Sequence, residues 1–212
     1  MQKNKKGFFI TIEGPEGSGK STQAFLLAQW LEKQKLQVFL TREPGGCAIG
    51  KKIRQIILDP AHTALAPLTE AMLYAADRAQ HVAEELQPAL EEGKVIVCDR
   101  YSDSYLAYQG YGRGLPLAEI QYLDHMAAGT VKPDLTFFLM VLPETGFARV
   151  TKRQLPFDRM EQQTQAFHQR VYQGYLSIAA ANPKRIHLID GTQSPEKVAA
   201  DMQQEVAVRL GF

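Results

Sequence analysis

Five short runs dominated by apolar residues recur along the chain. They occupy residues 8–13, 37–43, 94–100, 134–141 and 185–190. Most of these runs are continuous rather than alternating, a pattern typical of strands that are buried on both faces of a parallel sheet. Longer segments with the period of an amphipathic helix separate them, among them residues 22–35, 68–93 and 195–210. Strands that alternate with helices predict a doubly wound α/β fold with right-handed crossovers.

Two prolines interrupt this pattern. Pro88 lies inside the second helical segment and is expected to kink or end that helix, because proline lacks the amide hydrogen. Pro156 breaks the segment 142–163, which is basic in its middle and lies between the fourth strand and another helix. We expect a single domain spanning residues 1–212, with a short basic lid at about residues 148–162.

The composition narrows the classes of protein and of partner. The 212 residues are 45% hydrophobic, which is enough for one substantial core. The formal net charge is +1, so no overall field attracts nucleic acid or a membrane surface, and neither is expected as a partner. No apolar run approaches the ~20 residues that cross a bilayer. Cys47 and Cys98 are far apart, which argues against a disulfide framework or a zinc site and favours a cytoplasmic location.

The stretch GPEGSGKS, residues 14–21, matches the phosphate-loop pattern G-x-x-x-x-G-K-[ST] between a strand and a helix. Its glycines allow backbone N–H groups to point inward at phosphates, and the following helix adds a partial positive charge. The residues expected to bind ATP are Gly14, Pro15, Glu16, Gly17, Ser18, Gly19, Lys20 and Ser21. Lys20 is expected to bridge the β- and γ-phosphates, and Ser21 to bind Mg²⁺. The alternative is a glycine-rich turn with a capping serine. No N-K-x-D tetrapeptide is present, which favours ATP over GTP.

An acid and several arginines lie near the strand ends. Asp99 ends the third strand and is a candidate ligand for Mg²⁺, with a helix-capping acid as the alternative. Arg42, Arg54, Arg78 and Arg100 lie near strand ends or on the helices beside them. A guanidinium fork matches a phosphate, so a convergence of these arginines would indicate a second phosphorylated ligand beside ATP. The alternative is that they are ordinary surface arginines.

An aromatic ring near these arginines is a further candidate contact. Tyr74 lies four residues before Arg78, and therefore on the same face of the predicted helix. Its ring is a candidate stacking platform for a nucleobase, with packing in the core as the alternative.

Five motifs after the phosphate loop resemble the thymidylate kinase family, and they follow its order along nearly the whole chain. They are TREPGG at 41–46, EAMLYAADRAQH at 70–81, DRYSDSYLAYQGYGRGL at 99–115, FDRMEQ at 157–162 and IDGTQSPEKV at 189–198. The resemblance implies a P-loop NTPase-type fold like that of nucleoside monophosphate kinases: a five-stranded parallel sheet with helices on both faces and a short basic lid. It also implies a homodimer, with the helices around residues 48–58 and 67–87 as contributors.

The resemblance implies a role for each matching position. Glu16 corresponds to an acidic loop residue near the acceptor sugar and its phosphate-binding arginine. The residues expected around dTMP are Arg42, Arg54, Tyr74, Arg78, Arg100, Tyr105, Tyr108 and Gln109. Tyr74 would stack on thymine, while Arg78 and Gln109 would hydrogen-bond the base. Tyr108 would lie against the 2′ face of the sugar. The loop after the last strand, residues 190–193, is implied for the adenine of ATP.

Two positions depart from the commonest family pattern. Members carry an arginine either in the phosphate loop or in the lid. Here Gly17 occupies the loop position, so the chain resembles the bacterial subtype in which the lid supplies the cation. The candidate lid cations are Arg149, Lys152, Arg153 and Arg159, of which we favour Arg153. Tyr105 stands where relatives usually have a small polar residue, so the details of base recognition are expected to differ. The residues expected to be catalytic are Lys20, Arg100, Arg153 and Glu16.

The activity implied by the resemblance is the transfer of the γ-phosphoryl group of ATP to dTMP, giving ADP and dTDP, with Mg²⁺ as cofactor. Because the acceptor is already an anionic phosphate, no strong general base is needed. The alternatives are a deoxynucleoside kinase, in which Glu43 would deprotonate a 5′-hydroxyl, another nucleoside monophosphate kinase, or a nucleotide-binding switch protein. Arg42 and Arg54 favour an anionic acceptor over a neutral one.

Overall fold

The computed structural model describes residues 7–212, so the part of the expected domain at residues 1–6 lies outside the description. All five strands are parallel, and their order across the sheet is β2-β3-β1-β4-β5. They are β1 (Phe8–Glu13), β2 (Val38–Arg42), β3 (Val95–Asp99), β4 (Leu135–Met140) and β5 (Ile186–Asp190). Each strand falls within one of the five apolar runs, so the predicted five-stranded parallel sheet is confirmed.

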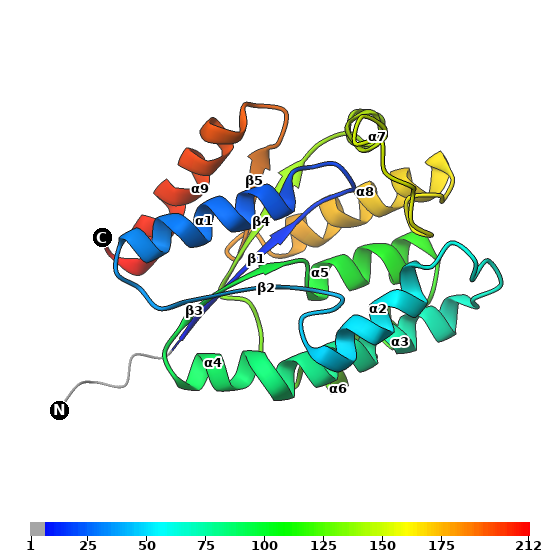
Figure 1. The fold of residues 1–212 in the computed structure, drawn as a ribbon, viewed down its shortest axis with the longest axis horizontal. Coiled ribbons are helices and arrows are strands. Elements are labelled where there is room, and N and C mark those ends of the chain that lie inside the picture. The colour runs from blue at the N-terminus through cyan, green and yellow to red at the C-terminus, as the bar shows by residue number, and fades with distance from the viewer. Residues whose placement is uncertain (1–6) are drawn as a thin grey trace.

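Helices cover both faces of the sheet (Figure 1). They are α1 (Lys20–Lys33), α2 (Ala48–Leu58), α3 (Pro67–His81), α4 (Gln87–Glu91), α5 (Ser102–Tyr105), α6 (Leu117–Ala128), α7 (Pro143–Thr151), α8 (Gln165–Ala181) and α9 (Pro195–Leu210), with π-helical segments η1 (Val82–Leu86) and η2 (Leu106–Gly112). Helices α1 and α9 pack on one face through Leu27, Leu31 and Met202. The opposite face is covered by η1, α4 and α6, and by η2 and α8.

The helix around Pro88 differs from the expectation of a kink or an end. The helical path continues from α3 through η1 into α4, and Pro88 lies in the first turn of α4. Just before the proline the turn widens, because the Gln87 N–H bonds the Val82 carbonyl rather than the carbonyl four residues back. The widened turn accommodates Pro88 inside a continuing helix, because proline has no N–H to donate to the preceding turn.

The carboxyl ends of the central strands meet at one edge of the sheet, where ligands bind in folds of this type. The register places Arg42 of β2 beside Asp99 of β3, and Asp99 beside Ile12 of β1. The phosphate loop follows β1 directly. Loops from distant parts of the sequence are therefore brought together at this edge. Among residues 7–212, none of the helices combines the length and the hydrophobicity that a bilayer-spanning segment requires.

Candidate active site

The phosphate loop connects β1 to α1 and depends on three glycines with positive φ. The φ angles are 151° at Gly14, 70° at Gly17 and 94° at Gly19, values that side chains rarely allow. A Cβ atom at Gly17 would also lie only 2.1 Å from the carbonyl oxygen of Gly146 in α7. The loop and α7 thus approach each other backbone to backbone, and an arginine cannot occupy the Gly17 position in this arrangement. This contact gives a physical reason for a cation to come from the lid.

Lys20 begins α1 and turns its side chain back over the loop. Its Nζ donates to the Pro15 carbonyl at 2.8 Å and to Ser18 Oγ at 3.3 Å, and the residue is 6% exposed. Burial, followed by the Arg100 guanidinium, lowers the pKa of Lys20 to about 8, against the opposing effect of nearby carboxylates. A cation held by neutral acceptors in this way is available to bind phosphate oxygens.

Ser21 of α1 and Asp99 of β3 bring two side-chain oxygens together that could bind a metal ion. Ser21 Oγ donates to Asp99 Oδ2 at 2.5 Å. The second oxygen, Oδ1, is buried and has no hydrogen-bond partner within residues 7–212. Mg²⁺ is bound by such hard oxygen ligands, commonly by one or two protein groups together with substrate phosphates. No group of three or more His, Cys, Asp or Glu residues in this part of the chain could hold a metal alone. The pair therefore fits a magnesium ion that arrives with a nucleotide.

Arg100 is the centre of the polar contacts around the loop. Its φ is +72°, an uncommon conformation for a residue other than glycine. Its Nη2 donates to Glu16 Oε1 at 2.8 Å and to the Tyr108 hydroxyl at 3.2 Å. Burial would raise the pKa of Glu16, but the Arg100 and Lys20 cations outweigh it and lower the pKa to about 2. The acid in the phosphate loop is therefore ionised and paired with an arginine.

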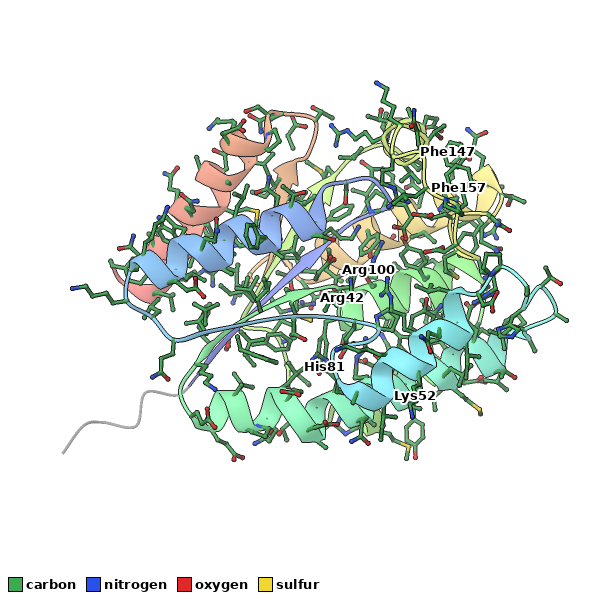
Figure 2. The ribbon with its side chains drawn as sticks, in the orientation of Figure 1. Arg42, Lys52, His81, Arg100, Phe147 and Phe157 are labelled. Carbon is green, nitrogen blue, oxygen red and sulfur yellow. The ribbon has the colours of Figure 1, made fainter. Side chains whose placement is uncertain are left out.

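Six cations and the Ser21–Asp99 pair border one cavity of about 450 Å³. These cations are Lys20, Arg42, Arg54, Arg100, Arg149 and Arg153. Arg42 is exposed, and Arg54 donates to the Pro44 carbonyl at 2.8 Å. Burial, and then the proximity of Arg42, lower the pKa of Arg54, as expected where cations gather without an anion. Arg42 and Arg100 can be followed in Figure 2, at the carboxyl end of the sheet. The cavity has the charge and size for phosphate groups.

A smaller cavity of about 90 Å³ adjoins the first. Residues predicted to contact the nucleoside of dTMP line it together: Tyr74, Arg78, Tyr105, Tyr108 and Gln109. Glu16, Arg54 and Arg100 border both cavities. Arg54 and Arg100, both predicted for the acceptor phosphate, therefore lie at the junction between a cation-rich space and a space walled by aromatic rings, whereas Arg42 borders only the cation-rich one of the two.

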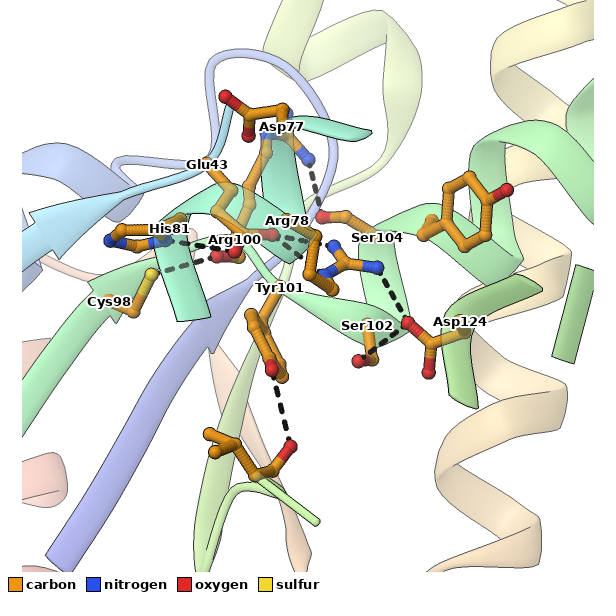
Figure 3. A network of polar contacts seen from close by, with 12 residues as sticks. Glu43, Asp77, Arg78, His81, Cys98, Arg100, Tyr101, Ser102, Ser104 and Asp124 are labelled. Atoms are coloured by element: carbon orange, nitrogen blue, oxygen red, sulfur yellow. Dashed lines mark hydrogen bonds and ion pairs between the residues drawn. The ribbon is translucent and has the colours of Figure 1, made fainter. Parts of the chain in front are cut away.

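The Arg78 side chain is almost fully enclosed, at 2% exposure, in a network of polar contacts (Figure 3). Its Nε and Nη2 donate to Glu43 Oε2 at 2.9 and 2.6 Å, and Nη1 donates to Asp124 at 2.6 Å. The guanidinium lies 4.6 Å from the ring centre of Tyr101. Three of its five N–H groups are thus engaged, which leaves two for a base at the cavity wall.

Glu43 has no free oxygen for acid–base chemistry. Its Oε2 accepts from Arg78, and its Oε1 contacts His81 Nδ1 at 2.9 Å. A carboxylate engaged in this way cannot deprotonate a 5′-hydroxyl, so the residue that supported the deoxynucleoside kinase alternative has a structural role instead. Glu43 holds Arg78 in place, and the TREPGG motif alone did not predict this role.

The hydroxyl of Tyr105 uses its proton in a hydrogen bond outside the small cavity. It donates to the Ala71 carbonyl of α3 at 3.1 Å, and the ring lies 5.3 Å from the Arg78 guanidinium. Gln109 Nε2 donates to Glu70 Oε1 at 2.9 Å. Tyr105 therefore contributes shape rather than a polar contact, which is the physical consequence of the larger residue at this position.

The expected lid residues separate into two groups. Arg149 Nη1 donates to the carbonyl of Gly191 at 3.0 Å and more weakly to that of Gly17, and Arg153 Nη2 donates to Glu161 Oε1 at 2.6 Å. Arg159 is buried instead, where its Nη2 donates to Glu70 Oε2 at 2.5 Å. Arg159 does not border the large cavity, so its position does not support a role as the lid cation. Lys152 is exposed and lies outside the cavity.

Comparison with known proteins identifies the relatives of this chain. A family model described as thymidylate kinase matches residues 12–202. The chain belongs to the thymidylate kinase family. A protein named thymidylate kinase from Synechococcus sp. (strain JA-2-3B'a(2-13)) is 50% identical over 204 residues, which are 95% of each protein. One from Lactobacillus acidophilus is 47% identical over 207 residues, 97% of this chain and 96% of that protein.

A solved structure gives the same result at the level of the fold. The crystal structure of thymidylate kinase from Ehrlichia chaffeensis matches with a TM-score of 0.77 and 33% identity, covering 94% of this chain and 98% of that one. The family, the enzyme class and the P-loop fold that the motifs predicted are confirmed.

Three residues near the loop were missed by reasoning from the sequence. Glu13, Ser104 and Tyr175 are all buried, and they contact one another beside Arg100. Burial, then the Asp103 carboxylate, raise the pKa of Glu13 to about 7. Glu13 ends an apolar run, which is a weak signal for a special role, whereas nothing in the sequence connects Tyr175 of α8 with the loop.

Proposed function

We propose that the two adjoining cavities hold ATP and dTMP end to end, with the transferring phosphate between them. The chain phosphorylates dTMP to dTDP, the reaction of its family and a step in dTTP synthesis, with ATP as the donor. The observation that carries the arrangement is the large cavity bordered by Lys20, Arg42, Arg54, Arg100, Arg149 and Arg153, because this cation-rich space adjoins the cavity lined by aromatic rings. Fixed cations of this kind offset the repulsion between two polyanions.

On the donor side, the backbone of residues 14–21 holds the ATP phosphates, and Lys20 moves from the Pro15 carbonyl to the β- and γ-phosphates. On the acceptor side, Arg42, Arg54 and Arg100 bind the dTMP phosphate. Glu16 keeps Arg100 oriented between the two ligands, through the 2.8 Å ion pair. The acceptor oxygen attacks the γ-phosphorus, and the bond from that phosphorus to the β-bridging oxygen breaks as ADP leaves. The acceptor is already anionic, so no side chain has to remove a proton.

Ser21 and Asp99 are the proposed protein contacts of Mg²⁺. The support is the short contact between them and the buried, unpartnered Oδ1 of Asp99 within the described residues. A magnesium ion bound there with ATP would supply charge neutralisation at the phosphates. Ser21 and Asp99 would hold that ion beside the phosphate loop.

The nucleoside of dTMP occupies the smaller cavity. We assign stacking on thymine to Tyr74, hydrogen bonds with the base to Arg78 and Gln109, and contact with the sugar to Tyr108, since all of them line this cavity. Tyr105 walls the same space with its ring. The network that fixes Arg78 supports this assignment, because a guanidinium held on three sides reads a base edge at a defined place.

The lid, at about residues 148–162, is proposed to close over the phosphates. Phe147 and Phe157, whose ring centres are 5.4 Å apart, connect α7 to the segment after it. Arg153 borders the large cavity with its side chain 46% exposed, and its only ion pair within residues 7–212 is with Glu161. We propose that Arg153 exchanges Glu161 for the γ-phosphate when the lid closes, which also excludes water as a competing acceptor.

Arg153→Ala is expected to lower kcat by about tenfold to a hundredfold with little change in the Kd for dTMP, because Arg153 would act on the transferring group. Single-turnover kinetics and equilibrium binding measure the two quantities. Lys152→Ala is the matched control, since this neighbouring cation is exposed and lies outside the cavity. Unchanged kcat in Arg153→Ala, together with a loss in Arg149→Ala, would assign the role to Arg149.

We propose that the protein is a homodimer whose interface is the outer surface of α2, α3 and α6. Large apolar side chains are exposed there on neighbouring helices, among them Ile49, Ile56, Leu68, Met72, Tyr122 and Met126. Apolar surface that extends over adjacent helices is typical of an interface.

Sedimentation velocity is expected to give twice the 23.7 kDa mass of the chain. Met72→Glu should produce monomers, whereas Val208→Glu, an equally drastic change on α9, should not. A monomeric parent protein at micromolar concentration would refute the dimer.

A cytoplasmic location is also proposed. Both cysteines of the chain, Cys47 and Cys98, are free and buried, as is common in a reducing compartment.

A further inference from the structure

Glu13 is a buried carboxylate that the reaction, as proposed above, does not use. It is the last residue of β1, and it is 0% exposed. A carboxylate removed from water is costly unless hydrogen-bond donors surround it. Its Oε1 accepts the backbone N–H of Tyr101 at 2.7 Å. Its Oε2 accepts a close hydrogen bond from Ser104 Oγ and a longer one, 3.3 Å, from the Tyr175 hydroxyl.

Each of these three contacts leads to Arg100. Tyr101 follows Arg100 directly in the chain. Ser104 Oγ and the Tyr175 hydroxyl each accept a hydrogen bond from Arg100 Nη1, both at 3.1 Å. One oxygen of Glu13 therefore contacts the backbone beside Arg100, and the other contacts the side-chain atoms that hold its guanidinium.

The backbone contact acts on a strained conformation. Arg100 has a φ of +72°, which costs free energy in a residue with a side chain. The N–H of Arg100 donates to the Ile12 carbonyl at 3.0 Å, and the next N–H, that of Tyr101, donates to Glu13. Both peptide N–H groups that flank the strained residue are thus bound by the end of β1. Loss of the second contact would release the turn that points the guanidinium toward the cavity.

The direction of the hydrogen bonds makes an acceptor at Glu13 necessary. A guanidinium has only donors, whereas an ionised carboxylate has only acceptors. Ser104 Oγ donates to Glu13, and the Tyr175 hydroxyl lies 2.7 Å from Ser104 Oγ and 3.3 Å from Glu13. The protons of this chain therefore run toward the carboxylate, and both hydroxyls keep lone pairs for Arg100. An amide at position 13 would present a donor to one of these hydroxyls, in competition with the guanidinium.

We propose that Glu13 is a positioning residue that holds Arg100 in the orientation required to bind the acceptor phosphate. Two hydroxyls, of Ser104 and Tyr175, and one peptide N–H transmit its effect. Glu13 itself does not touch the nucleotide. This inference rests on the proposed role of Arg100 in binding the phosphate of dTMP.

The test compares ligands that differ only in the phosphate. Glu13→Gln has almost the same shape but brings a donor to the network, and the comparison is made at pH 8, above the pKa of about 7 of the parent carboxyl. We expect the Kd for dTMP to rise about tenfold, while the Kd for thymidine and the Kd for ATP stay unchanged. Calorimetry and competition binding measure all three. The thermal unfolding of the variant is recorded alongside.

Asp134→Asn is the matched control. Asp134 Oδ2 also accepts a backbone N–H of β1, that of Phe9 at 2.8 Å, but at the opposite end of the strand from the phosphate loop. This variant should lose stability without changing any of the three dissociation constants. A rise of the Kd for dTMP in Asp134→Asn as large as in Glu13→Gln would show that the effect is general loosening of β1, and would overturn the proposal.

Arg100→Lys separates this inference from the proposed function. If Arg100→Lys weakens dTMP binding but folded Glu13→Gln does not, the positioning role of Glu13 is wrong while the role of Arg100 stands. If Arg100→Lys leaves dTMP binding unchanged, both are wrong. Equal losses for dTMP and thymidine in Glu13→Gln would also overturn the proposal, because the defect would then lie in the nucleoside cavity.

Two milder variants carry the test if Glu13→Gln does not fold. Tyr175→Phe and Ser104→Ala each remove one hydroxyl between Glu13 and Arg100 and leave the carboxylate in place. Each is expected to raise the Kd for dTMP about threefold and to leave the Kd for thymidine unchanged. Unchanged dTMP binding in both variants would overturn the proposal.

Discussion

Lys20→Ala is expected to lower kcat for dTMP phosphorylation about a thousandfold, with the fold intact, because one preorganised cation at the transferring phosphate contributes on that order. The Nζ group is 2.8 Å from the Pro15 carbonyl, so it is already held above the loop before ATP binds. The alanine variant loses this charge without opening the core, since α1 packs through Leu27 and Leu31. Stopped-flow or coupled-assay turnover measures kcat, and circular dichroism checks the fold.

Lys33→Ala is the matched control for Lys20→Ala. Both lysines belong to α1, as its first and last residues, but Lys33 lies at the end remote from the phosphate loop. Turnover of Lys33→Ala should equal that of the parent. Near-normal turnover in Lys20→Ala would remove Lys20 from the mechanism.

The lowered pKa of Lys20 adds a pH dependence to the same experiment. A lysine is cationic below its pKa, and kcat/KM reports the ionisation of the free enzyme. Since the pKa of Lys20 is about 8, kcat/KM for ATP in the parent enzyme should fall as the pH rises above 8. Lys20→Ala should lack this fall.

Asp99→Asn is the second change with a large expected effect. It is expected to lower kcat about a hundredfold and to raise the Mg²⁺ concentration needed for half-maximal activity, because the amide carries no charge for a divalent cation. The buried Oδ1 of Asp99 has no hydrogen-bond partner among the described residues, so this oxygen is available to a metal ion or to a water bound by one. Activity titrations with Mg²⁺ at saturating nucleotide measure both effects.

Asp201→Asn serves as the control for Asp99→Asn. Asp201 lies in α9, where its carboxylate pairs with Lys197 on the surface. It is far from β3 in the sequence and lines neither of the two cavities. Its loss should leave the Mg²⁺ dependence unchanged. An unaltered Mg²⁺ requirement in Asp99→Asn would mean that Asp99 caps the segment after β3 and does not serve the metal, which was the alternative from the sequence.

The strands and the phosphate loop could be predicted because their signals are local. A continuous apolar run indicates a strand buried on two faces, and GPEGSGKS needs only its own glycines and the helix that follows. The helix around Pro88 shows the limit of prediction from local signals. Proline predicts a break there, but the helix continues through a widened turn, and Leu86 and Ala89 pack on the sheet. Tertiary packing outweighs a local preference of this size.

The partners of the charged side chains could not be predicted in the same way. Arg78 and Arg159 both looked like cations available to a ligand. Arg78 is held by Glu43 and Asp124, and Arg159 by Glu70, which is 89 positions away along the chain. Position in the sequence does not reveal which carboxylate lies opposite a given guanidinium, because that depends on the order of strands and the packing of helices.

By itself, the amino-acid sequence determined the parallel sheet, the phosphate loop and the family, because hydrophobic period and motif spacing act over a few neighbouring residues. Only the tertiary structure decided that Glu13 contacts Ser104 and Tyr175 beside Arg100, that the Tyr105 hydroxyl is bound to α3, and that Gly17 lies against α7. These contacts join residues up to 162 positions apart, such as Glu13 and Tyr175. They exist because parallel strands bring their carboxyl ends to one edge, where distant loops must share the same space.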